Sequence, residues 1–332
     1  MKKILCSVLC ISGFLTTSAA KASTSNYQYC STDGCRTGGS NLVTSDYAKT
    51  KYPLVFAHGL TGFSSLGGGF DYWYGIPQNL TTNGANVFVT QEAAMNSSTI
   101  RGEQLLNQVQ QILAITGEHK VNLIGHSQGA QTVRYVAAVI PNQVASATTI
   151  GGANGDIPIA NLVYNLTQTS AVGTMVITPV LETALNSFFT IVGIASGHYY
   201  DQNSLSALSS LDSTGIIAFN AQFPAAVPTQ PCGQGAPIVN GVRYYSWTGI
   251  GKYTNPLNPA SPLMLAMSIA TPSKNDGIVP QCSSHLGQVI RDDYNQNHLD
   301  EVNQIAGLTD IFSVSPVTLY RQHANRLKVA GL

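Results

Sequence analysis

Short apolar runs and amphipathic segments alternate along the chain, and their order predicts an α/β fold. Apolar runs at 52–57, 85–90 and 144–150 are typical of buried strands. Between the second and third run lies a helical stripe that ends at Gly117, and glycine commonly follows the last turn of a helix. The stripe consists of Ile100, Leu105, Leu106, Val109, Ile112 and Leu113. We therefore expect a mostly parallel sheet with helices on both faces.

A further strand and helix surround the pentapeptide Gly125-His-Ser-Gln-Gly129. An apolar run precedes it and an amphipathic segment follows at 130–140. In this order the serine stands on a sharp, strained turn, and the two glycines leave room for that turn. The backbone N–H groups that begin the helix then point at an oxyanion on the substrate. We predict that Ser127 is a catalytic nucleophile; an idle serine in a tight structural turn is the alternative.

The first predicted strand ends in a glycine-punctuated loop at 58–63. In hydrolases of this architecture that loop supplies one oxyanion donor, and the residue after the nucleophile supplies the other. We assign these donors to the backbone N–H groups of Leu60 and Gln128, each typically contributing about 3 kcal/mol in the transition state. His58 precedes the serine in the chain, so we expect it to brace the loop rather than to act as the base.

The triad should be completed in the order serine, acid, histidine. Among the acids after Ser127, Asp276 alone follows an apolar segment (263–270) and opens a tight turn, as expected of an acid at a strand end. His298 follows a predicted strand at 286–290 and a polar loop, where the triad histidine is usually delivered. We predict Asp276 and His298 as acid and base, and a structural role for His285 and His323. The other acids between Ser127 and His298 are Asp156, Glu182, Asp201, Asp212, Asp292 and Asp293.

The first 22 residues have the features of a signal peptide. Two lysines precede a mostly apolar run at 4–15, which is too short to span a membrane, and Ala20-Lys-Ala22 resembles a cleavage site. The whole chain has 16 basic and 16 acidic residues; cleavage after Ala22 removes three lysines and no acid, which leaves a net charge of −3. No basic cluster indicates a nucleic-acid partner.

Four cysteines remain after this cleavage, and an even number in an exported protein favours disulfides. Three pairings are possible, of which we favour Cys30–Cys35 and Cys232–Cys282. The second would close a loop of about 50 residues and stabilise the fold by roughly 4 kcal/mol. A metal site is the alternative, but no histidine lies at zinc-like spacing from a cysteine pair.

Two further segments differ from their surroundings. Residues 23–45, rich in Ser, Thr, Gly and Asn, are expected to form an irregular arm, and residues 46–332 a single domain. Residues 171–200 are strongly apolar and contain a single carboxylate, Glu182. We expect a helical lid at roughly 170–197, with a buried helix pair as the alternative.

Many stretches of this chain resemble the bacterial true lipases of the foldase-dependent type, the Pseudomonas and Burkholderia lipase family. The resemblance covers roughly residue 46 to the end, and it implies an α/β-hydrolase fold with Ser127, Asp276 and His298 as the triad. It also agrees with the two oxyanion donors and with the Cys232–Cys282 pair. It implies a periplasmic lipase foldase and type II secretion as partners. The matching stretches are 52–59, 70–77, 101–106, 121–127, 134–138, 202–205, 239–242, 244–247, 282–287, 297–304 and 320–327.

The resemblance also implies a calcium ion beside the histidine loop. Three of its four ligands match the Asp300 carboxylate and the carbonyls of Gln304 and Leu308, while the fourth, an aspartate in the relatives, falls on Asn258. No acid lies between Ser213 and Asn275 to replace it. Because calcium affinity follows ligand charge, we expect a weaker site than in the relatives. The alternative is a lost site in which Asn258 caps a turn.

The expected activity is that of a secreted triacylglycerol lipase acting through an acyl-enzyme at an oil–water interface. A short-chain carboxylesterase or polyester hydrolase with the same triad is the alternative reading. A non-catalytic binding protein on the same scaffold is a third possibility, which the intact serine, acid and histidine disfavour.

Overall fold

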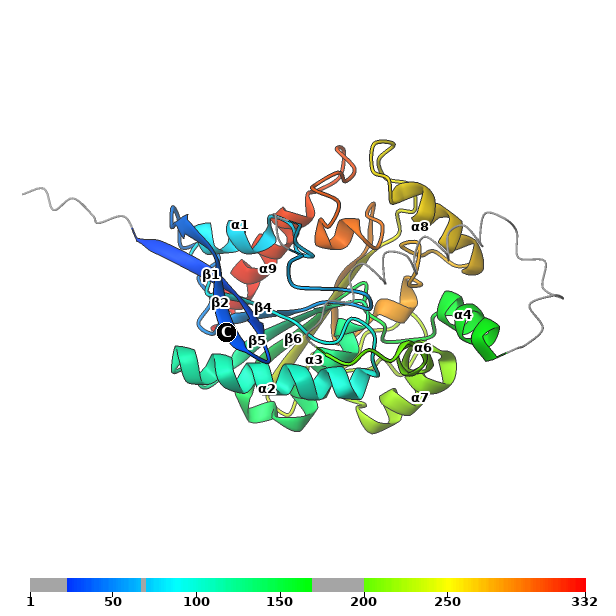
Figure 1. Cartoon of the computed structure of the whole chain (residues 1–332), viewed down its shortest axis with the longest axis horizontal. Coiled ribbons are helices and arrows are strands. Elements are labelled where there is room, and N and C mark those ends of the chain that lie inside the picture. Colours follow the sequence, from blue (N-terminus) through cyan, green and yellow to red (C-terminus); the bar gives the residue numbers. More distant parts are fainter. Residues whose placement is uncertain (1–22, 67–69, 169–199) are drawn as a thin grey trace, which may run out of the picture.

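The computed structural model describes residues 23–66, 70–168 and 200–332, which share one mixed sheet (Figure 1). Its strands follow the order β2-β1-β4-β3-β5-β6-β8-β7, and β9 pairs with β8. All neighbours run parallel except the pairs β1–β2 and β7–β8. This sheet confirms the predicted α/β class. The strands are β1 (Thr24–Ser31), β2 (Gly34–Leu42), β3 (Leu54–Ala57), β4 (Val87–Thr90), β5 (Val121–His126), β6 (Val144–Ile150), β7 (Ile238–Val239), β8 (Val242–Gly249) and β9 (Gln288–Tyr294).

Helices cover both faces of the sheet, with α1 and α9 on one side and α2 and α3 on the other (Figure 1). Adjacent residues of β3 point to opposite faces, so Phe56 packs in the cluster under α1 and α9 while Val55 packs in the cluster under α2 and α3. Both faces are therefore buried, which explains the continuous apolar runs of the central strands. The helices are α1 (Ile76–Thr82), α2 (Ser98–Thr116), α3 (Gly129–Val139), α4 (Pro158–Gln168), α6 (Ser204–Leu211), α7 (Ser213–Gln222), α8 (Ser261–Met267) and α9 (Pro316–Val329).

The predicted central elements are confirmed. The runs at 52–57, 85–90 and 144–150 contain β3, β4 and β6, and the amphipathic stripe lies on α2, which ends at a left-handed Gly117 with φ 69°. One expectation was wrong. The apolar segment 263–270 is not a strand but α8 followed by a 3-10 turn, so Asp276 stands in a loop and not at a strand end.

The irregular arm expected at 23–45 is also a wrong prediction, because this segment forms the hairpin of β1 and β2. Strand β1 pairs parallel with β4, placing Tyr27 opposite Val87 and Tyr29 opposite Val89. Both tyrosines are buried, and their rings meet edge to face at 5.5 Å. The hairpin thus extends the main sheet by two strands, and its turn ends at Gly34, whose φ of 103° favours glycine.

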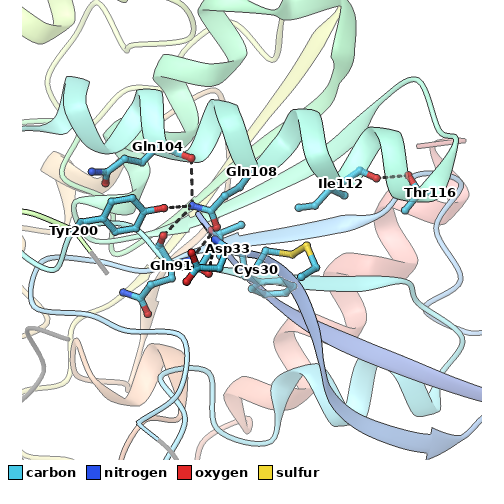
Figure 2. The surroundings of a disulfide bond; sticks show 12 residues. Cys30, Asp33, Gln91, Gln104, Gln108, Ile112, Thr116 and Tyr200 are labelled. Carbon is cyan, nitrogen blue, oxygen red and sulfur yellow. Dashed lines mark hydrogen bonds between the residues drawn. A yellow bond between two sulfur atoms is a disulfide. The ribbon is translucent and has the colours of Figure 1, made fainter. Parts of the chain in front are cut away.

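Both predicted disulfide pairings are confirmed. Cys30 and Cys35 face each other across the hairpin, and Cys30 packs in the same apolar cluster as residues of α2. Close to this disulfide, Gln108 of α2 donates hydrogen bonds to the Gln91 carbonyl at 2.8 Å and to the Tyr200 hydroxyl at 3.3 Å (Figure 2). The end of the hairpin therefore lies where α2 and the segment after β4 meet.

Two predictions concern residues outside the described ranges, namely the signal peptide at 1–22 and the lid at roughly 170–197. Among the helices of the described ranges, none has the length and apolar character that a membrane crossing needs.

A buried histidine on α9 gives the protein a pH-dependent stability. His323 of α9 bonds to the Thr148 hydroxyl at 2.9 Å and faces the Arg326 guanidinium at 3.1 Å. Burial, followed by the charge of Arg326, lowers the pKa of His323 to about 3, while the unfolded chain binds this proton near 6.5. The resulting stability is present above pH 6.5 and is lost as the pH falls towards 3.

We therefore expect the free energy of unfolding to fall more steeply between pH 7 and 4 in the native protein than in His323→Gln. The difference should reach on the order of 3 kcal/mol at pH 4, measured by denaturant titration. His119→Gln, the same change at an exposed position, is the matched control and should keep the native slope. Parallel curves for all three proteins would contradict the prediction.

Candidate active site

The predicted nucleophile stands on the turn between β5 and α3. Ser127 adopts a φ of 56°, a left-handed conformation that is strained for a residue with a side chain. The flanking glycines are required by space: a Cβ at Gly125 would meet the carbonyl of Gly129, and one at Gly129 would meet the carbonyl of Ala57. The sequence pattern and the strained backbone thus have the same cause, since only this turn fits between the strand and the helix.

The predicted oxyanion donors lie beside this turn. Within the described ranges, the backbone N–H groups of Leu60 and Gln128 have no hydrogen-bond acceptor. The loop that carries Leu60 is fixed by bonds from Thr61 N–H to the Ala94 carbonyl at 2.7 Å and from Gly62 N–H to the Gly59 carbonyl at 3.1 Å. Two free donors on a fixed backbone can stabilise a negatively charged oxygen.

The buried guanidinium group of Arg101 stabilises this loop by hydrogen bonds to its backbone. The Arg101 guanidinium donates to the carbonyls of His58, Gly59 and Ala93. His58 bonds through Nδ1 to the Gly59 carbonyl at 2.8 Å, and its Nε2 accepts the Glu92 N–H at 3.2 Å. Burial and the nearby Arg101 charge lower the pKa of His58 to about 3. His58 is therefore a neutral brace of the loop, as the sequence indicated.

The predicted acid and base are in contact. His298 Nδ1 and Asp276 Oδ2 are 2.7 Å apart. In addition, the backbone N–H of His298 donates to the backbone carbonyl of Asp276 at 2.8 Å. The other carboxylate oxygen accepts the N–H groups of Ile278 and Val279 at 2.8 and 2.7 Å. Both carboxylate oxygens are thus bonded and the side chain is fully buried, which orients the imidazole and fixes its tautomer.

Ser127 and His298 line one apolar cavity beside the oxyanion donor Leu60. In the described part of the chain no hydrogen bond joins the Ser127 hydroxyl to the His298 imidazole. The two side chains line the same cavity, and His298 is bonded to Asp276. The apolar wall comes mainly from α4, α6 and α8, and its side chains are Ile157, Ile159, Ala160, Val163, Leu208, Leu211, Met267, Ile278 and Leu299.

Two buried neighbours of His298, His126 and Glu301, are not revealed by the sequence. His126, next to the nucleophile, bonds through Nδ1 to the Tyr72 hydroxyl at 2.6 Å, and its ring centroid lies 4.4 Å from that of His298. Glu301 is buried, and its Oε2 lies 3.4 Å from His126 Nε2 and 4.0 Å from His298 Nδ1. Glu301 follows His298 by three residues, a spacing that places both on one side of a helical turn and was the available signal.

Burial and neighbouring charges shift the pKa values of both Glu301 and His126. Burial, followed by the negative charge of Asp276, raises the pKa of Glu301 well above its ordinary value. Burial and His298 lower the pKa of His126 well below its ordinary value. One ligand atom from each of His126, His298 and Glu301 lies within 4.8 Å of the others, an arrangement compatible with a metal ion.

Among the other candidates within the described ranges, His285 and Asp212 do not line this cavity, and Glu182 lies outside those ranges. His285 bonds to the Gly233 carbonyl at 2.9 Å and to Asp292 at 3.0 Å. Asp212 caps α7 through the Gly215 N–H at 2.7 Å. These contacts, like those of His323, are structural.

Three of the four residues expected to bind calcium, Asn258, Asp300 and Leu308, are in contact, but through hydrogen bonds. Asn258 Nδ2 donates to Asp300 Oδ1 at 3.1 Å and to the Leu308 carbonyl at 2.8 Å. Its Oδ1 accepts the Ala260 N–H at 2.8 Å. Gln304 lies between Asp300 and Leu308 in the chain, and its backbone N–H donates to the Leu299 carbonyl at 3.1 Å. The amide group therefore presents hydrogens, not a lone pair, to the proposed position of the ion.

Comparison with known proteins agrees with this geometry. The family model of the alpha/beta hydrolase fold matches residues 52–286. A triacylglycerol lipase of Vibrio cholerae serotype O1 is 48% identical over 297 residues, covering 89% of this chain and 94% of the relative. A triacylglycerol lipase of Pseudomonas fragi is 41% identical, covering 86% and 99%. A triacylglycerol lipase of Burkholderia plantarii is 39% identical, covering 88% and 90%.

Among solved structures, the mature form of a Bacillus licheniformis lipase matches with a TM-score of 0.53 at 18% identity, covering 79% of this chain and 90% of that one. A metagenomic carboxyl esterase matches with a TM-score of 0.55 at 15% identity, covering 87% and 77%. At these identities the likeness shows a common fold.

Proposed function

Since the chain belongs to the α/β-hydrolase fold family and, within it, to the bacterial triacylglycerol lipases, we propose that it hydrolyses the ester bonds of acylglycerols. The observation that carries this proposal is that Ser127 and His298 line one apolar cavity and that Asp276 is bonded to His298. The cavity offers a long acyl chain a mostly apolar surface, and the same cavity is lined by Ser127 and His298, which would act on the ester.

The proposed mechanism assigns one task to each of these groups. His298 takes the proton of the Ser127 hydroxyl as its oxygen attacks the ester carbonyl, and Asp276 stabilises the imidazolium. The N–H groups of Leu60 and Gln128 bind the oxyanion. His298 then gives the proton to the leaving alcohol. Water hydrolyses the acyl-enzyme by the same transfers, which releases the fatty acid and restores the serine.

A chain-length series tests the substrate class. We expect kcat/KM for p-nitrophenyl esters to rise from acetyl towards long acyl chains, because each added methylene enters an apolar cavity at about 0.8 kcal/mol. Ala160→Phe, which narrows the cavity wall on α4, should lower kcat/KM for long esters and spare acetyl ester. Ile217→Phe at an exposed position of α7 is the control. A decline of kcat/KM with chain length would favour the carboxylesterase or polyester hydrolase reading.

We further propose that the protein is secreted through the periplasm, with residues 1–22 as its signal peptide, a lipase foldase as its folding partner and type II secretion as its export route. The resemblance to the Pseudomonas and Burkholderia lipases supports these assignments. The two disulfides agree with an oxidising compartment.

Calcium does not fit the expected site as the residues stand. A calcium ion needs oxygen lone pairs directed at it, and the Asn258 side chain directs its N–H groups there. No step of the proposed mechanism therefore depends on calcium.

A further inference from the structure

We infer that the side-chain amide of Asn258 holds the histidine loop in place without a metal ion. Asn258 is buried, with 1% of its surface exposed, as is Asp300. Its amide lies between the Asp300 carboxylate and the Leu308 carbonyl, and it donates one hydrogen bond to each. Asn258 Nδ2 thus bridges the Asp300 and Leu308 oxygens, which a bound cation would otherwise bridge.

The orientation of the amide follows from its three partners. The oxygen faces a donor, the Ala260 N–H at 2.8 Å, while the nitrogen faces two acceptors. Turning the group over would place its oxygen against those acceptors and its nitrogen against the donor. Three favourable contacts would become unfavourable inside a buried site, where unpaired polar groups are strongly destabilising.

The charge of the surroundings leads to the same conclusion. Asp300 supplies one negative charge, and its second oxygen already accepts the Asn297 N–H at 3.1 Å and the Thr254 hydroxyl. The chain from Ser213 to Asn275 contains no acid that could add a second charge. A single carboxylate is well satisfied by hydrogen bonds, whereas calcium affinity depends on the number of charged ligands.

The amide acts on the active site through the loop, which makes Asn258 a positioning residue. His298 lies between Asn297, whose side-chain oxygen accepts the Asp300 N–H at 2.9 Å, and Asp300 itself. Through its hydrogen bond to Asp300, Asn258 therefore connects the turn at 255–260 to the loop that follows His298. This inference rests on the proposed function only where it assigns a catalytic role to His298. The hydrogen bonds of Asn258 do not depend on that function.

The wild-type protein gives the first test. Its thermal unfolding midpoint should be the same in EDTA and in calcium chloride, and titration calorimetry with calcium should show no binding. A higher Tm in calcium, or heat of specific binding, would overturn the inference, because it would mean that the Asn258 amide rotates to admit an ion. This measurement needs neither a variant nor activity.

The second test converts the amide into a carboxylate. Asn258→Asp loses both donated hydrogen bonds and faces Asp300 with a like charge, so its Tm in EDTA should lie about 4 °C or more below wild type. Calcium should restore it, and kcat should recover with it at unchanged KM, because the ion returns the loop that carries His298 to register. A variant that ignores calcium would overturn the inference that the amide occupies a cation position.

Asn255→Asp is the matched control. Asn255 lies in the same turn, but its Nδ2 donates to the Thr309 carbonyl at 2.8 Å and not to Asp300. We expect this variant to lose stability without any response to calcium, and an equal response in both variants would overturn the inference. An inactive wild type with the predicted Tm values would count against the proposed function alone, since the calcium results do not depend on hydrolysis.

Discussion

Replacing Ser127 by alanine is expected to lower kcat for ester hydrolysis by about 10⁵- to 10⁶-fold. The proposed acyl-enzyme cannot form without the hydroxyl, and the residual rate comes from binding and from the donors Leu60 and Gln128. Alanine also relieves none of the strain at φ 56°, so the turn and the unfolding midpoint should stay nearly unchanged. Hydrolysis is measured under saturating substrate, and the Tm is measured on the same preparation.

Covalent labelling separates loss of the nucleophile from loss of the fold. An organophosphonate should modify wild type at Ser127, as seen by peptide mass spectrometry, and leave Ser127→Ala unmodified. Ser268→Ala removes a different hydroxyl, which is buried and donates to the Leu265 carbonyl at 2.7 Å, and this variant should keep both activity and labelling. An unlabelled wild type would favour a non-catalytic binding protein, and hydrolysis by Ser127→Ala would assign the nucleophile elsewhere.

Site residues whose conformation is determined by their neighbours in the chain could be predicted from the sequence. The glycines around Ser127 are required by backbone contacts within a few residues of the turn, so the pentapeptide alone reveals them. The place of His298 after the apolar run at 286–290 and a polar loop is also a local signal. Asp276 was identified for a partly wrong reason, since it follows a helix, but its turn is local: the Asn275 side chain accepts the Gly277 N–H at 2.9 Å.

Features that depend on distant partners could not be predicted. Tyr27 and Tyr29 alternate with polar residues and a glycine ends their turn, which is a weak strand signal. Strand β1 pairs with its neighbour β2 and also with β4, about 60 residues away in the chain, and only the second pairing joins the hairpin to the main sheet. Likewise, the sequence left both readings of Asn258 open, because the orientation of an amide is set by its hydrogen-bond partners.

Replacing Asp276 by asparagine is expected to lower kcat by about 10⁴-fold with little change in stability. The amide oxygen can still accept the N–H groups of Ile278 and Val279, so the loop is retained. The amide nitrogen, however, would donate to His298 Nδ1. The imidazole proton would then sit on Nε2, where the proton of Ser127 must be received. A nearly wild-type rate in this variant would mean that Asp276 is not the acid of the triad.

Alanine at the same position should be less harmful than asparagine, because Glu301 lies within reach of the same nitrogen. Its Oε2 is 4.0 Å from His298 Nδ1 and has no hydrogen-bond partner among the described residues. Removing Asp276 also removes a negative charge that raises the pKa of Glu301, which favours ionisation of the remaining carboxylate. We therefore expect kcat to rank wild type above Asp276→Ala, and Asp276→Ala above Asp276→Asn.

The double variant Asp276→Ala with Glu301→Gln decides whether Glu301 causes this ranking. It should fall to the level of Asp276→Asn, because no carboxylate then faces the imidazole. Glu301→Gln alone is the control: its Oε1 still accepts the Gly249 N–H and the Thr248 hydroxyl, bonded at 2.5 and 3.0 Å in wild type, so kcat should stay close to wild type. If the double variant is as active as Asp276→Ala, Glu301 does not assist His298 and the residual activity comes from the oxyanion donors and substrate binding.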